Sequence, residues 1–159
     1  MTRLLVFVDA PPVAVVRAGG QFSLIATEAL LADALVFVID GDERAEPDQW
    51  SVQVGARRHM AVPAGVDLAA QLDRYPWRFM NHSCAPNTRI DGREVRTIRP
   101  IEAGEQLTFD YDTTEWQMAA PFECRCGSPH CRGLIRGYRH LPPLERRRLD
   151  PIAAPYLPR

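Results

Sequence analysis

Three of the four cysteines fall between residues 124 and 131, where the chain reads CRCGSPHC, and this spacing limits how the C-terminal part can fold. Cysteines separated by a single residue are poorly placed to form a disulfide with each other. They can instead turn inward on a loop around one metal ion, and Gly127 and Pro129 supply the turns that such a loop needs. The segment is therefore a candidate metal-binding loop.

A structural zinc ion takes four ligands in a tetrahedron, whereas this loop offers three thiolates. Cys84 is the only other cysteine of the chain, and His130 is a second candidate that would compete for space with Cys131. In a reducing compartment such a set is more often a metal site than two disulfides. On spacing alone, the alternative of free or paired thiols without a metal stays open.

The charge of the chain argues against some classes of partner. The formal net charge is -1, whereas general binding to a phosphate backbone needs a broad cationic face. No apolar stretch approaches the length needed to span a bilayer, and the apolar run at residues 4–8 is too short for a secretion signal. We therefore expect a cytoplasmic protein with no membrane partner and no direct nucleic-acid partner.

Short apolar runs separated by turn signals predict a mostly β domain. Residues 50–54 alternate between apolar and polar side chains, which is typical of a half-buried strand. Asp91 and Gly92 form a strong hairpin turn pair. Strands are predicted at residues 4–8, 22–26, 34–39, 50–54, 88–90, 94–98 and 106–111, and short helices at residues 66–72 and 143–149.

Three long motifs occur in a fixed order along the chain. Residues 78–87 read RFMNHSCAPN, residues 104–111 read GEQLTFDY, and residues 124–133 read CRCGSPHCRG. Together they resemble the SET-domain protein-lysine methyltransferase family, including its post-SET segment. The resemblance implies a SET-domain fold: a β-clip of several small sheets with a pseudoknot, in which residues 81–82 lie against residues 107–111, plus a zinc-binding post-SET segment.

Composition and resemblance together divide the chain into four parts. These are an N-terminal lead-in at residues 1–16, a SET domain at 17–115, a post-SET zinc segment at 116–138 and a C-terminal tail at 139–159. The resemblance also implies one structural zinc ion held by four thiolates, from Cys84, Cys124, Cys126 and Cys131.

The resemblance gives Tyr111 the role of the catalytic tyrosine, beside the methyl group that is transferred. Because residues two apart on a strand share a face, Phe109 is expected to line the same substrate channel while Asp110 and Asp112 point away. Phenylalanine at residue 109 suggests that more than one methyl group can be added. The alternative for Phe109 and Tyr111 is core packing on a strand.

The resemblance implies S-adenosylmethionine as the cofactor, bound by a glycine loop near the N-terminus and by the NHSC motif. Ala18 stands where the family has the first glycine of that loop. The alternative for His82 is a hydrogen-bonded core histidine. The cofactor-binding residues carried over are Gly19, Gly20, Gln21, Phe22, Arg78, Asn81, His82 and Tyr111.

The expected activity is methyl transfer to a lysine amine in a protein or peptide substrate. The amine must be neutral to react, and holding a lysine neutral at pH 7 costs about 4.6 kcal/mol in water. A dry channel and the positive sulfonium of the cofactor lower the pKa of that amine. Two alternatives remain: a SET-like binding or scaffold module that has lost turnover, suggested by Ala18, and a SET-fold enzyme acting on a small molecule.

Overall fold

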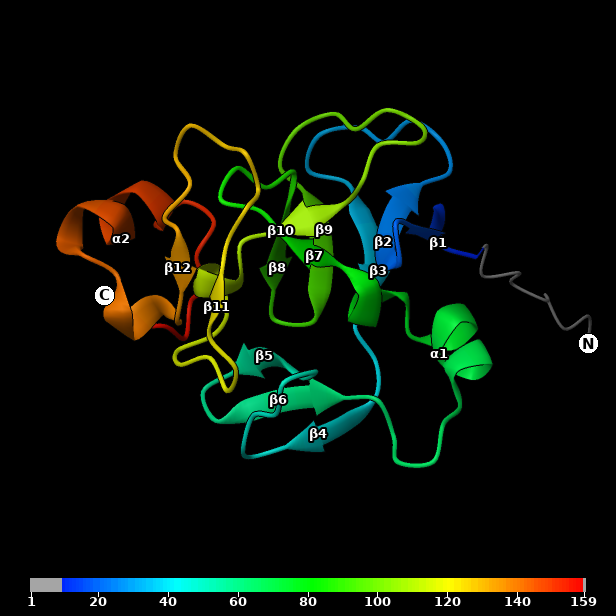
Figure 1. The fold of residues 1–159 in the computed structure, drawn as a ribbon, viewed down its shortest axis with the longest axis horizontal. Coiled ribbons are helices and arrows are strands. Elements are labelled where there is room, and N and C mark those ends of the chain that lie inside the picture. The colour runs from blue at the N-terminus through cyan, green and yellow to red at the C-terminus, as the bar shows by residue number, and fades with distance from the viewer. Residues whose placement is uncertain (1–9, 159) are drawn as a thin grey trace, which may run out of the picture.

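Five small sheets form the body of the protein, which a computed structural model describes over residues 10–158 (Figure 1). They confirm the predicted mostly β architecture. The strands are β1 (Val13–Ala18), β2 (Gln21–Ala26), β3 (Leu35–Val38), β4 (Asp42–Arg44), β5 (Val52–Gly55), β6 (Arg58–Ala61), β7 (Asn81–His82), β8 (Thr88–Asp91), β9 (Glu94–Thr97), β10 (Thr108–Phe109), β11 (Phe122–Glu123) and β12 (Leu134–Ile135). The helices are α1 (Leu68–Arg74) and α2 (Pro143–Leu149), with 3-10 turns η1 (Pro76–Phe79), η2 (Tyr111–Thr113) and η3 (Tyr138–His140).

β1 and β2 form an antiparallel hairpin whose two-residue turn is Gly19 and Gly20. Both glycines have positive φ, +56° and +82°, as the favoured hairpin turns require. β1 runs across residue 16, where we expected the lead-in to end, because its valines pack against the main core. The strand predicted at residues 4–8 lies outside the described residues.

The sheet of β3, β9 and β8 forms where strands were predicted, whereas β4 and β6 of the other three-stranded sheet were not predicted from the sequence. β8 and β9 pair as the predicted hairpin, with Asp91 opposite Glu94. β5, however, is buried throughout rather than half-buried. The reason is Gln53, whose amide donates to the Gly55 carbonyl at 3.0 Å and accepts from the Trp116 N–H at 2.9 Å. A polar side chain can be buried at low cost when its hydrogen bonds are satisfied in this way.

The predicted crossing of two distant segments is present. β7 and β10 pair in parallel, with Thr108 opposite Asn81 and Phe109 opposite His82. The prediction of a strand over residues 106–111 is wrong at its end, because the chain turns into η2 at Tyr111. Asp110 starts that turn by accepting a hydrogen bond from the Asp112 N–H at 3.1 Å.

Asn87 fastens the two crossing segments together. Its side chain donates to the Gln106 carbonyl at 2.8 Å and accepts from the Thr108 N–H at 2.9 Å. Asn87 itself is only 3% exposed, so its amide depends on these protein partners for its hydrogen bonds. Asn87 thereby fixes the position of β10 relative to the segment that follows β7.

The C-terminal segment is packed rather than trailing. Its second hydrophobic core lies beside β12, at the opposite end of the molecule from α1 (Figure 1). The Tyr156 hydroxyl lies 2.7 Å from the Gln53 carbonyl and 3.0 Å from the Thr114 carbonyl, so this segment braces β5 and the chain after η2. The buried members of this core are Tyr138, Leu141, Leu149, Ala154 and Leu157.

Across residues 10–158, no helix combines the length and the apolar character that crossing a membrane requires.

Replacing Asn87 with alanine should lower the free energy of unfolding by about 2 kcal/mol, because the backbone groups of residues 106 and 108 lose their side-chain partner at the crossing. Urea unfolding followed by circular dichroism measures this change. Gln49→Ala, at an exposed side chain, is the matched control and should stay within about 0.5 kcal/mol of the native protein. Equal midpoints for both variants would contradict the role of Asn87.

Candidate active site and metal centre

A cleft of about 1140 Å³ runs along the crossing. Its lining includes residues of the β1–β2 turn, of β7 and β10, of the chain at Ser51 and Val52, and of residues 118–120. Seven of the eight predicted cofactor residues line it: Gly20, Gln21, Phe22, Arg78, Asn81, His82 and Tyr111.

Gly19 and Ala18 contribute to the turn rather than to the cleft wall. Gly19 is not among the lining residues, and its positive φ sets the turn that presents Gly20. Ala18 is the last residue of β1 and pairs with Gln21. Because an extended strand position accepts alanine, Ala18 is compatible with this hairpin, and the left-handed positions fall on the two glycines that follow it.

Asn81 ties the hairpin to the crossing. Its amide nitrogen lies 3.0 Å from the Phe22 carbonyl, 3.2 Å from the Ser23 hydroxyl and 2.9 Å from the Gln106 side-chain oxygen. Its amide oxygen accepts from the Gln21 side chain at 3.4 Å. The glycine turn is therefore held over the cleft by contacts that reach to both crossing segments.

Tyr111 lies at the centre of the cleft inside an aromatic enclosure. Its ring centroid lies 4.7 Å from that of Phe109, 5.3 Å from that of His82 and 5.8 Å from that of Phe122. The hydroxyl donates to the Met80 carbonyl at 2.7 Å. Burial, reinforced by the negative charge of Glu115, raises the pKa of Tyr111 to about 12. At neutral pH the hydroxyl is therefore protonated and acts as an oriented dipole.

Phe109 and Tyr111 share the cleft as predicted, although Tyr111 stands in η2 and not on a strand. Asp110 and Asp112 point away from it, also as predicted. Both carboxylates bind Arg132, at 2.8 and 2.6 Å from Asp110 and at 3.2 and 2.8 Å from Asp112. We did not single out Arg132 from the sequence. The sequence did indicate that such a residue must exist, because two carboxylates directed into the protein need a buried cation.

The four cysteines come together at the edge of the cleft. Their sulfur atoms all lie within 4.8 Å of one another, and the Cys84 and Cys124 sulfurs are 3.9 Å apart. Tetrahedral zinc with bonds of 2.3 Å places its sulfur ligands about 3.8 Å apart, so the cluster fits one such ion. His130 is exposed and lies outside this group. The cluster members are Cys84, Cys124, Cys126 and Cys131.

Two nitrogen atoms lie close to the Cys84 sulfur, as hydrogen-bond donors to a metal ligand do. The backbone N–H of Arg132 donates to it at 3.5 Å, and His82 Nε2 lies 3.3 Å away. Such donors orient a thiolate ligand and stabilise its charge. Burial raises the pKa of Cys84, and that of Cys124 to about 11, so metal binding would displace protons from these thiols.

His82 connects the cysteine cluster to Tyr111. Its Nδ1 accepts from the Tyr111 N–H at 3.1 Å, so the neutral ring carries its hydrogen on Nε2, directed at Cys84. Burial lowers the pKa of His82 to about 4, which keeps the ring neutral at physiological pH. The ring thus spans the short distance between a cluster sulfur and the backbone of the central tyrosine.

The crossing, the cleft along it and the cysteine cluster at its edge define a small β domain in which four cysteines that could hold a metal ion lie beside a ligand-sized cleft. Residues 21–112 match the SET domain family model, and the chain belongs to the SET-domain family. The predicted fold class is confirmed by this match together with the structural neighbours described below.

Several curated proteins are similar to part of the chain. Methyltransferase flvH of Aspergillus flavus is 49% identical over 63 residues, which are 37% of this chain and 35% of that protein. Histone-lysine N-methyltransferase ASHH2 of Arabidopsis thaliana is 41% identical over 68 residues, or 38% of this chain and 4% of that protein. Histone-lysine N-methyltransferase ash1 of Drosophila melanogaster is 40% identical over 68 residues, which are 38% of this chain and 3% of that protein. The matched region spans about a third of flvH, at 35%, and far less of the others.

Two solved structures share the fold. KRYPTONITE in complex with mCHG DNA and SAH superposes with a TM-score of 0.53 at 22% identity, covering 77% of this chain and 28% of that one. KRYPTONITE in complex with mCHH DNA, H3(1-15) peptide and SAH gives a TM-score of 0.56 at 20% identity, covering 79% of this chain and 29% of that one. At these identities the likeness concerns the fold alone.

Replacing Arg132 with methionine should lower the free energy of unfolding by about 3–5 kcal/mol, because two buried carboxylates lose their cation. Urea unfolding at pH 7 measures the loss. Arg147→Met removes a cation from the exposed side of α2 and serves as the control, with a change near zero. An Arg132→Met protein as stable as this control would show that the ion pairs of Arg132 with Asp110 and Asp112 do not stabilise the fold.

Proposed function

We propose that this chain is an S-adenosylmethionine-dependent methyltransferase that acts on the side-chain amine of lysine in a protein substrate. The observation that carries the proposal is the setting of Tyr111. Its protonated hydroxyl is fixed by the Met80 carbonyl at 2.7 Å, in the middle of a cleft that starts at a glycine turn. Membership of the SET-domain family and relatives named histone-lysine methyltransferases support the same reaction.

The cleft residues suit the cofactor. The volume of about 1140 Å³ exceeds the space that a ligand of nucleoside size requires. A Cβ built on Gly20 would meet nothing within 4 Å, so the backbone there is open to a ligand. The turn at Gly20, together with Arg78, Asn81 and His82, would hold the cofactor, which when bound supplies a methyl group on a positively charged sulfur.

Tyr111 and Phe109 would position the acceptor amine. A hydroxyl with a pKa of about 12 is no base at neutral pH, but its fixed dipole can orient an amine nitrogen. The rings of Phe109 and Phe122 exclude water on either side of it. Alignment of this kind supplies much of the rate of a displacement at carbon. Addition of more than one methyl group stays a prediction based on Phe109.

Zinc is the ion we propose for the cysteine cluster. Four thiolate sulfurs in a compact group form a typical structural zinc site. Such an ion would join the loop at residues 124–131 to Cys84, two residues after β7. Because Cys124 and Cys126 also line the cleft, the ion would hold one wall of that cleft in place.

The other expectations about partners and location stay predictions. The net charge of -1 is the basis for expecting no direct nucleic-acid partner. A cytoplasmic location was expected from the sequence, and the names of the histone-lysine methyltransferase relatives make histones the first protein substrates to test.

Incubation with isotope-labelled S-adenosylmethionine and either histone H3 or lysate proteins, followed by mass spectrometry, tests the proposed activity. We expect label on lysine. The chain itself contains no lysine, so such label must lie on the substrate. Tyr111→Phe should keep the fold and lose about 100-fold or more of the turnover. Tyr75→Phe, a buried tyrosine outside the cleft, is the control and should keep its rate.

Absence of transfer together with cofactor binding would favour a binding module, and label on small molecules alone would favour the small-molecule alternative. Near-native turnover of Tyr111→Phe would remove that residue from the reaction.

Metal analysis of the purified protein should find one equivalent of zinc. Cys126→Ser should lose the ion and speed hydrogen exchange over residues 120–138, because the loop is then tied to the crossing by fewer ligands. Ser128→Ala, in the same loop but outside the cluster, should retain both metal and protection. Metal-free native protein with full protection over residues 120–138 would contradict a structural metal.

A further inference from the structure

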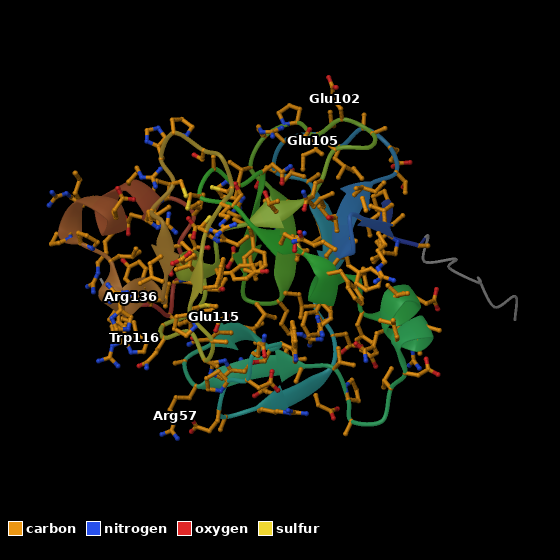
Figure 2. All side chains as sticks on the ribbon, viewed as in Figure 1. Arg57, Glu102, Glu105, Glu115, Trp116 and Arg136 are labelled. Carbon is orange, nitrogen blue, oxygen red and sulfur yellow. The ribbon has the colours of Figure 1, made fainter. Side chains whose placement is uncertain are left out.

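Glu115 is a buried carboxylate in the wall of the cleft. Its backbone N–H donates to the Tyr111 carbonyl at 2.9 Å, so it stands one turn after the tyrosine. It lines the cleft together with Ser51, Val52 and Met118, and is only 6% exposed. Figure 2 shows Glu115 beside β5, on the far side of the molecule from Glu102 and Glu105.

The two carboxylate oxygens of Glu115 have different surroundings. Oε1 accepts from the Gln53 N–H at 2.7 Å and from the Thr114 hydroxyl at 3.4 Å. Oε2 receives no hydrogen bond from any of residues 10–158. The nearest ionisable nitrogen, His59 Nδ1, lies 4.0 Å away, too far for a hydrogen bond, and is itself buried without a partner. One oxygen is therefore anchored and the other is available to a ligand.

Glu115 also has no permanent counter-charge. Within residues 10–158, no arginine lies within ion-pair distance of its carboxylate. The titratable groups in its electrostatic surroundings are His59 on β6, whose pKa burial lowers, and the hydroxyls of Tyr111 and Tyr156, whose pKa burial and the Glu115 charge raise. All three are neutral at pH 7. Burial likewise raises the pKa of Glu115 to about 7.

Burying a carboxylate without a cation is costly, and such a group in a cleft indicates a ligand that brings the positive charge or the proton. Resting on the proposed function, we propose that Glu115 is a second catalytic residue, whose Oε2 accepts a proton from the substrate ammonium before methyl transfer. The anchored Oε1 keeps the carboxylate directed along the cleft, and the missing counter-charge draws an ammonium ion toward it.

The proton and electron balance is complete. One N–H bond of the substrate ammonium breaks, its proton binds Oε2, and the electron pair stays on nitrogen. That pair forms the new bond to the methyl carbon, while the electrons of the carbon–sulfur bond remain on sulfur. The methylated amine leaves as an ammonium ion, and Glu115 returns its proton to solvent. Tyr111 is unsuited to this step because its hydroxyl holds its own proton, whereas a group that titrates near the working pH is well suited.

The pH dependence of methyl transfer to a lysine substrate tests this role in the full-length chain. Glu115→Gln keeps the acceptor for the Gln53 N–H and removes a buried charge, so it should fold normally. We expect a rate about 100-fold below native at pH 7, with the deficit shrinking at least about tenfold by pH 10 as the free amine loses its own proton. The native rate should fall as pH drops through about 7, because Glu115 becomes protonated.

Glu28→Gln, at an exposed carboxylate outside the cleft, is the control and should follow the native profile. A Glu115→Gln deficit that is the same at every pH would indicate a structural role and overturn the proposal. So would a native rate for Glu115→Gln at pH 7.

A second measurement needs no turnover, and it uses butylamine as a mimic of the lysine side chain. In protein labelled with ¹³C at glutamate carboxyls, the signal missing from Glu115→Gln identifies Glu115. Butylamine should shift that signal in the native protein and in Glu28→Gln, and should bind Glu115→Gln at least tenfold more weakly, whereas butanol should not discriminate. An unmoved Glu115 signal, or equal binding by all three proteins, would overturn the proposal. Specific butylamine binding without methyl transfer to any substrate would instead overturn the proposed function and leave the amine site standing.

Discussion

The parallel pairing of β7 with β10 is the contact on which the rest of the structure depends. Each strand contributes two residues, so the backbone bonds between them cannot hold the crossing alone. Side chains complete it: Asn87 spans residues 106 and 108, and the Tyr111 hydroxyl reaches back to Met80. Several residues that line the cleft, and Cys84 of the cysteine cluster, lie within a few residues of this crossing in sequence.

Two connections couple the cysteine cluster to the cleft. His82 stands between the Cys84 sulfur and the Tyr111 N–H, and Arg132, next to Cys131, binds the two carboxylates that flank Tyr111 in sequence. Both connections involve buried groups, where electrostatic interactions are strong and costly to break. The cysteine-bearing segment is therefore coupled to the central tyrosine both through His82, which lines the cleft, and through Asp110 and Asp112, which do not.

The sequence predicted those parts of the site that lie within long motifs, such as the cysteine set, the crossing and the Phe109–Tyr111 pair. It did not reveal Glu115 or its surroundings. Gln53 occupies an outward position in an alternating pattern, and only the folding of the C-terminal segment over β5 buries it. Residues 150–157 contain no helix or strand. No periodic pattern in the sequence could therefore predict that this segment packs over β5. Of the two-residue strands, only β11 and β12 lay outside every predicted strand and motif crossing.

Calorimetric titration of S-adenosylhomocysteine into the protein, before and after removal of metal with a chelator, tests the central claim most directly. If the crossing forms a cofactor cleft with a metal-held wall, one molecule binds per chain, and chelation weakens that binding because Phe122, Cys124 and Cys126 leave the cleft. Absence of binding at millimolar ligand, or binding that chelation does not change, would contradict the account.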